Sequence, residues 1–151
     1  MMTPSIFNQA DNQKMIERIQ QLSSNSGALW GKMTVNQMFK HCAAAIDVAL
    51  GNKDLKINFV LRILGSMMRK IVLNAPEFKK NVATAKEFVF TGQYDFDASK
   101  QELIEKFQQF AIKGPHAIKD LQHPFWGNMT YDEWDVLMWK HLNHHLTQFG
   151  V

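Results

Sequence analysis

The chain has 151 residues, of which 46% are hydrophobic, and this fits a single domain, residues 1–151, large enough to bury a core. The net charge is only +3 and the basic residues are spread along the sequence, which argues against binding to nucleic acid. A single cysteine, Cys42, excludes a disulfide within the chain and favours a reducing, cytoplasmic location. The N-terminus lacks a basic region followed by an apolar run, so we expect no secretion signal.

Helical periodicity begins near the N-terminus. Asp11 or Asn12 can cap a first helix over residues 12–24, in which apolar residues recur every three or four positions. A second helix starts after the capping box Thr34-Val35-Asn36-Gln37, in which the Thr and Gln side chains bind the free amides at the helix start. We expect this helix to end near Gly51.

Residues 57–73 form the longest apolar segment, but basic residues such as Arg62 interrupt it. A membrane-spanning helix needs about 20 predominantly apolar residues, so we expect no membrane span. The apolar positions keep helical spacing opposite a polar stripe, which predicts an amphipathic helix lying across the domain and ending at Pro76. Met67 and Met68 lie on the apolar stripe, where methionine usually fills the core.

The segment 76–96 has no sustained period and is predicted to be a loop, briefly extended at residues 87–90. A capping box at Ser99-Lys100-Gln101-Glu102 predicts another helix, which ends at Gly114. The absence of Asn-Gly and Asp-Gly pairs gives no hairpin signal.

The last helix opens with a further capping box, Thr130-Tyr131-Asp132-Glu133, and is expected to run to about Phe149. The chain thus contains four main helices and one accessory helix at residues 57–73. This pattern predicts an all-α helical bundle.

Three histidines are predicted to lie on the inner faces of these helices. His141 and His145 are four residues apart, which places their Cβ atoms about 5–6 Å apart on one helix face, and His41 lies on the apolar face of the second helix. Burying each imidazole unpaired costs roughly 1–3 kcal/mol, a cost that a shared divalent metal removes. Three histidines with an open position are typical of catalytic zinc sites. The alternative is an empty polar cluster satisfied by water and neighbouring groups.

The position of the histidines along their helices constrains how the helices pack. At a rise of 1.5 Å per residue, the three histidines lie at the same height along the two helices, to within about a turn, only if the second and last helices are antiparallel. We therefore expect antiparallel packing of these two helices.

Four other residues are less favoured candidates for the site. His123 can be a fourth ligand or a partner of the backbone, and His144, one residue off the stripe, is expected to be exposed or in a dimer contact. His116 is expected to face solvent. Cys42 can be a nucleophile, although its pattern favours a small buried hydrophobic residue.

Two other classes of metal site do not match the spacing. A zincin needs a glutamate after its first histidine, but Leu142 follows His141. A di-iron bundle needs Glu-x-x-His pairs, and no glutamate precedes a histidine by three positions. A DNA-recognition helix is also disfavoured, because the last helix carries mainly Trp, Met and His on its stripe.

Four segments resemble the DinB superfamily, and more specifically a branch of it catalogued only as a domain of unknown function. They are Leu29-Trp30-Gly31-Lys32-Met33-Thr34, His41-Cys42, His123-Pro124-Phe125-Trp126-Gly127 and the run from Lys140 to Gly150. The resemblance spans nearly the whole chain. It implies an up-down-down-up four-helix bundle, with the accessory helix in the long crossover between helices two and three, and often a homodimer.

The resemblance also implies a chemistry. It makes His41, His141 and His145 the ligands of a divalent metal, Zn or Ni, and implies a transferase or isomerase that uses a low-molecular-weight thiol such as glutathione, mycothiol or bacillithiol. A metal can bind a thiol and deprotonate it. Many relatives carry Arg-Gly-Gln after the last ligand, whereas Leu146-Thr147-Gln148 follows it in this chain.

Two functions remain open. The first is a metal-dependent enzyme of the thiol-transferase or a related hydrolytic type, whose reactive group is a metal-bound thiol or water. The second is a non-catalytic, stress-associated bundle that binds a small ligand or a partner. Faces rich in Phe, Trp and Met also predict a homodimer.

Overall fold

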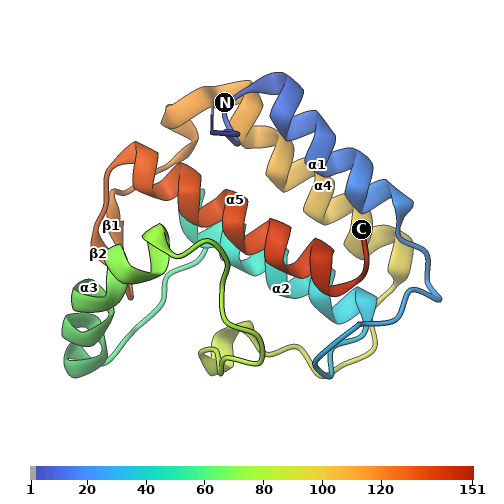
Figure 1. Cartoon of the computed structure of the whole chain (residues 1–151), viewed down its shortest axis with the longest axis horizontal. Coiled ribbons are helices and arrows are strands. Elements are labelled where there is room, and N and C mark those ends of the chain that lie inside the picture. Colours follow the sequence, from blue (N-terminus) through green and yellow to red (C-terminus); the bar gives the residue numbers. More distant parts are fainter. Residues whose placement is uncertain (1–2) are drawn as a thin grey trace.

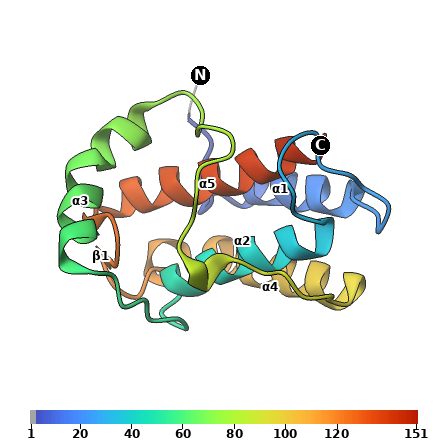
Figure 2. The same cartoon turned by 90° about the horizontal axis from the view of Figure 1, so that it is seen from below.

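A computed structural model describes residues 3–151 and shows a mostly helical chain, consistent with the predicted all-α class (Figures 1 and 2). The long helices are α1 (Gln9–Gln21), α2 (Val35–Ala49), α3 (Phe59–Asn74), α4 (Phe96–Lys113) and α5 (Tyr131–Gln148). The short elements are the 3-10 helices η1 (Lys86–Phe88) and η2 (Gly114–Ala117) and the strands β1 (Gln122–His123) and β2 (Gly127–Asn128).

Four of the helices pack around one core. Helices α1 and α2 both contact α4 and α5, and α1 and α5 run from left to right in Figure 1, whereas α2 and α4 run from right to left. Each helix contributes large buried side chains, including Ile19 from α1, Phe39 from α2, Phe107 from α4 and Trp134 from α5. Full burial of a side chain of this size stabilises the fold by about 1.5–3 kcal/mol.

Polar contacts fix how α2 is rotated about its axis. Lys106 of α4 binds Asp47 and Glu102 at 2.6 and 2.7 Å, and Lys40 of α2 binds Glu102 at 2.6 Å. Adjacent helical residues point in directions about 100° apart. The contact of Lys40 with α4 therefore leaves His41 facing α5.

Two capping boxes are confirmed and set the starts of the helices that carry the three histidines. Thr34 accepts a hydrogen bond from the Gln37 amide, and the Gln37 side chain binds the Thr34 amide in return. Thr130 and Glu133 form the same reciprocal pair at the start of α5.

The predicted starts of α1 and α4 are wrong. The Asn8 side chain accepts from the amides of Ala10 and Asp11, so α1 begins at Gln9. Asn12, one of the predicted caps, is buried and donates to two backbone carbonyls.

In α4, the Asp95 side chain accepts from the Ala98 amide, and Ser99 is buried within the helix. An aspartate one turn upstream therefore replaces the predicted capping box at residues 99–102.

The segment between α3 and α4 is largely loop, as predicted, but the stretch expected to be extended at residues 87–90 is extended only after Phe88, at Val89. Residues Lys86–Phe88 form the turn η1, in which the Phe88 amide bonds to Ala85. This turn directs the Phe88 carbonyl toward His41 of α2.

A short antiparallel strand pair, β1 and β2, was not predicted. Gln122 pairs with Asn128 and His123 pairs with Gly127, whose φ of 77° suits glycine. The turn between the two strands therefore uses Trp126-Gly127 and not an Asn-Gly or Asp-Gly pair, which are the usual signals of a hairpin.

Helix α3 lies at one end of the molecule against this strand pair (Figures 1 and 2). Gly65 allows the close approach, since a Cβ there would lie 2.2 Å from the Phe125 carbonyl oxygen. The prediction that Met67 and Met68 fill the core is wrong, because they are 73% and 42% exposed. None of the helices within residues 3–151 combines the length and apolar character required to cross a membrane.

Candidate metal centre

Helices α2 and α5 bring the three predicted histidines together. His41 of α2 lies opposite His141 and His145, which occupy successive turns of α5, and the three ring centroids are 4.6 to 5.0 Å apart. The Nε2 atoms of His41 and His141 are 3.0 Å apart. One ligand nitrogen from each of the three residues lies within 4.8 Å of the others, so the cluster can hold a metal ion.

The backbone near η1 fixes the tautomer of His41. Its Nδ1 lies 2.9 Å from the Phe88 carbonyl oxygen, which can only accept a hydrogen bond. Nδ1 therefore carries the proton and donates it, and Nε2 keeps a free lone pair directed at His141.

A chain of hydrogen bonds fixes His145 in the same way. The Gln148 amide nitrogen donates to the Trp30 carbonyl at 2.8 Å, so the Gln148 oxygen faces His145 Nδ1 at 2.8 Å. This oxygen accepts the Nδ1 proton, which leaves the lone pair of His145 on Nε2. Outer hydrogen bonds of this kind orient most metal-binding histidines.

The spacing of the nitrogens fits a metal. Two imidazole nitrogens bound at 2.0–2.1 Å to a tetrahedral zinc stand about 3.3 Å apart. The 3.0 Å between His41 Nε2 and His141 Nε2 is close to that value. Without a metal, the proton of His141 lies on Nε2 and is donated to His41. In the other tautomer the proton lies on Nδ1, and Nε2 of His141 is then the third nitrogen with a free lone pair.

Burial keeps the three imidazoles neutral. Desolvation lowers the pKa of His41 below its usual value, although the hydrogen bond to Phe88 opposes this shift. Desolvation also lowers the pKa of His145 to about 3, and the pKa of His141 falls well below 6.5 through desolvation and the neighbouring histidines. Metal ligation requires neutral imidazole, so the cluster is in its binding-competent charge state at pH 7.

His144 and His116 lie outside the cluster. His144 is partly buried, with its ring centroid 5.7 Å from Trp30 and 6.1 Å from Phe78. His116 is exposed, as predicted.

His123 is a partner of the backbone and not a fourth ligand. Its Nδ1 accepts hydrogen bonds from the amides of Phe125 and Trp126 at 3.0 and 3.1 Å. The ring proton is therefore on Nε2, and neither nitrogen has a free lone pair for a metal. The buried ring packs against Trp134, with centroids 5.0 Å apart.

Cys42 follows His41 but points into the core. Its side chain is buried, and desolvation raises the pKa of the thiol far above neutral. A thiol held in this form is a poor nucleophile, so the expectation of a small buried hydrophobic residue is confirmed.

Sequence reasoning did not identify the groups that orient the histidines. Gln148 follows His145 by three positions on the same helix face, a spacing that signals contact. The carbonyls of Phe88 and Trp30 are backbone groups, and no side-chain pattern reveals them.

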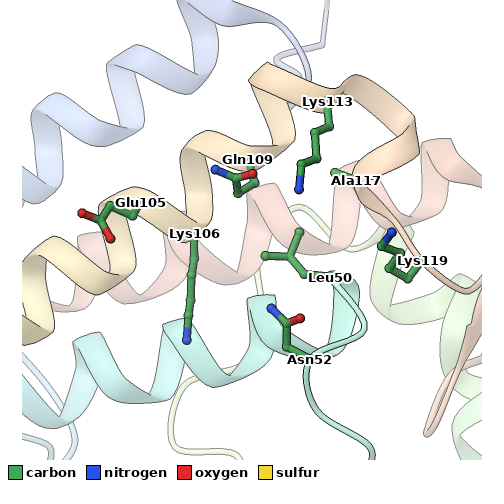
Figure 3. Close-up of a pocket in the computed structure, with 8 residues that line it drawn as sticks. All are labelled: Leu50, Asn52, Glu105, Lys106, Gln109, Lys113, Ala117 and Lys119. Atoms are coloured by element: carbon green, nitrogen blue, oxygen red, sulfur yellow. The ribbon is translucent and has the colours of Figure 1, made fainter.

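A surface pocket of about 300 Å³ lies between α2, α4 and η2, and none of the three histidines lines it (Figure 3). Lys113 and Lys119 on its rim are exposed, and the Lys106 ammonium is neutralised by Asp47 and Glu102. The pocket and the three-histidine cluster are therefore separate features of the structure.

The fold and the cluster define a helical protein with a three-histidine site suited to a metal ion. The chain belongs to the family described as "Protein of unknown function (DUF1569)", which matches residues 4–150. No curated protein and no solved structure matches the chain.

The buried His123 generates a prediction about stability. Burial lowers its pKa from 6.5 to about 4, so the unfolded chain takes up a proton at this residue before the folded chain does. The stabilisation is complete above pH 6.5 and is lost as the pH falls toward 4, by about 3 kcal/mol in all. Urea unfolding across this range should show a shallower loss of stability in His123→Gln than in the natural chain.

The exposed His116 provides the control, because His116→Gln should keep the natural pH dependence. Equal slopes for His123→Gln and the natural chain would show that His123 is not buried in its neutral form.

Proposed function

We propose that this protein binds one divalent metal ion, Zn or Ni, through His41, His141 and His145, and that it is a metal-dependent enzyme resembling the thiol-dependent transferases. The observation that carries the proposal is the pair of imidazoles, on two different helices, whose Nδ1 protons are held by carbonyl oxygens. Such pairing directs both Nε2 lone pairs into the same space.

We also propose that the chain is a member of the DinB superfamily with the up-down-down-up four-helix bundle. The directions of α1, α2, α4 and α5 support this topology, as does the placement of α3 in the long crossover between α2 and α4 (Figure 1). The positions of the three histidines on the second and the last helix of the bundle agree with the same assignment.

The chemistry follows from the ligand set. A bound divalent ion lowers the pKa of a coordinated thiol or water and thereby supplies a nucleophile near neutral pH. The chain's own residues hold the site for this purpose, since Phe88 and Gln148 keep two imidazoles in the required tautomer. A reducing cytoplasm, where such thiols are abundant, is the compartment we propose.

The residues after His145 favour a second candidate function. Leu146 and Thr147 stand where many relatives carry Arg and Gly, so these two positions supply no arginine to hold an anionic substrate. The second candidate is therefore a non-catalytic, stress-associated bundle in which the same site binds a small ligand.

Metal titration tests the proposal. The purified protein should bind zinc or nickel with one ion per chain near pH 7.5, and the ion should raise the unfolding temperature because its ligands bridge α2 and α5. Alanine at His41, His141 or His145 should abolish both effects, as measured by calorimetric titration and thermal unfolding.

His144→Ala is the matched control and should keep most of the metal-induced shift, since His144 lies outside the cluster. Failure of the natural chain to bind either ion, with no change on His41→Ala, would rule out the metal-dependent enzyme. Equal losses for His144 and His145 would contradict the assignment of the ligands.

Gln148 should tune the affinity without ligating the metal. Gln148→Met removes the acceptor for His145 Nδ1 and the bond to Trp30 while preserving the length of the side chain. Loss of such an outer partner typically weakens metal binding about 10- to 100-fold, and we expect that decrease in a competition titration with a chelator.

Gln101→Met is the matched control, because Gln101 is exposed on α4 and bonds only to Glu105. If both variants bind zinc as tightly as the natural chain, the hydrogen-bond chain does not orient His145.

A further inference from the structure

Helix α3 turns its apolar side away from the protein. Phe59, Val60, Met67 and Ile71 are 69–73% exposed, and we call the side of the helix that they mark the apolar arc. The four side chains together expose about 500 Å², and the largest apolar patch of a typical monomer covers about 300–600 Å² and often has a function. The apolar arc therefore has the size of a binding surface.

The opposite side of α3 holds the helix on the protein. Arg69 donates to the carbonyls of Trp126 and Asn128, and Gly65 lies against Phe125. At about 100° per residue, Gly65 and Arg69 lie roughly opposite the centre of the apolar arc. These contacts therefore keep the apolar arc facing outward, whereas an ordinary surface helix turns its apolar side toward its own core.

The segment that carries the apolar arc is positively charged. Residues 55–76 contain none of the 14 acidic side chains of the chain and four of its 17 basic ones, Lys56, Arg62, Arg69 and Lys70. Arg69 pairs with Glu133. The other three basic side chains are exposed, and none of them forms an ion pair within residues 3–151. A surface with this charge favours an anionic partner.

Lys70 lies within the apolar arc itself. It follows Met67 by three residues, which places it about 60° from Met67 around the helix, and it is exposed. A lysine in this position can lay its methylene chain among apolar groups and keep its ammonium in a polar layer. Apolar side chains combined with lysine and arginine are typical of helices that lie in the interface of a membrane, about 5–10 Å deep between headgroups and acyl chains.

A second copy of the chain fits this surface poorly. If two apolar arcs met, both Lys70 ammonium groups would enter an apolar contact, and α3 has no acidic residue to pair with them. Burying an unpaired charge is costly, and like charges across an interface oppose association. A bilayer with anionic headgroups avoids this conflict, because it offers an apolar layer and a negatively charged layer side by side.

Helix α3 is already formed and accessible before it binds. Asn58 caps its first turn by accepting from the Val60 amide at 2.8 Å, and Lys140 donates to the carbonyls of Leu73 and Ala75 at its end. A preformed helix avoids the entropic cost of ordering a flexible segment on binding. The helix also lies at one end of the molecule, where a flat surface can approach it (Figures 1 and 2).

We propose that α3 docks this protein on the surface of a membrane that contains anionic lipids. The apolar arc lies at the boundary between headgroups and acyl chains, and Lys70 places its ammonium among the headgroups. Binding then has an apolar part, which any bilayer provides, and an electrostatic part of about 5-fold in affinity for each basic side chain near the anionic surface. Neither part uses the three histidines, so this docking is independent of metal binding.

Cosedimentation of the full, metal-free chain with lipid vesicles tests this proposal separately from the proposed function. The natural chain should bind vesicles with about one-third phosphatidylserine more tightly than vesicles of pure phosphatidylcholine. Met67→Glu should weaken binding to the phosphatidylserine vesicles about 10- to 100-fold, the factor that burial of a side chain of this size contributes. Lys70→Gln should weaken the same binding about 5-fold and leave binding to pure phosphatidylcholine unchanged. Both side chains are exposed, so the helical circular dichroism should not change.

Ile112→Glu and Lys113→Gln are the matched controls, because both residues are exposed on α4 and lie outside the apolar arc. Both variants should bind vesicles as the natural chain does. Failure of the natural chain to bind phosphatidylserine vesicles would overturn the proposal, as would unchanged binding by Met67→Glu. Equal binding to the two kinds of vesicle would overturn the role of anionic lipid. A lipid-free dimer that Met67→Glu dissociates would show that a second copy covers the apolar arc and would also overturn the proposal.

Discussion

Three imidazoles meet between α2 and α5, and the surrounding structure keeps them neutral and hydrogen-bonded. An imidazole buried without a partner would cost roughly 1–3 kcal/mol, and a charged one considerably more. The carbonyl of Phe88 and the side chain of Gln148 meet this requirement for His41 and His145. His141 can bond either to His41 or to a metal. If the hydrogen bond between His41 and His141 is given up, all three imidazoles can present a free nitrogen to one metal ion.

The need for hydrogen-bond partners at the buried imidazoles also explains contacts between distant segments of the chain. Gln148 bridges His145 and the loop before α2 by donating to Trp30. Gly31 has a φ of 82°, and a Cβ there would lie 2.7 Å from the Gln148 amide nitrogen, so a larger residue would disturb this bridge. The loop before α2 and the last turn of α5 thus form one unit around the site.

The sequence predicted the features that depend on local patterns. The Thr34 and Thr130 capping boxes and the four-residue spacing of His141 and His145 are local signals, and each corresponds to an observed feature. The start of α4 was missed because Asp95 and Ser99 both resemble caps and only packing decides between them. The orientation of α3 was missed because helical periodicity identifies an apolar side but not what that side contacts.

His41, His141 and His145 are proposed to hold one divalent metal ion together. X-ray absorption at the zinc edge of the zinc-loaded protein measures the donor atoms directly. We expect three imidazole nitrogens at about 2.0–2.1 Å from the zinc, with a light atom in the remaining position. Fewer than three imidazoles, or a protein sulfur at about 2.3 Å, would contradict it.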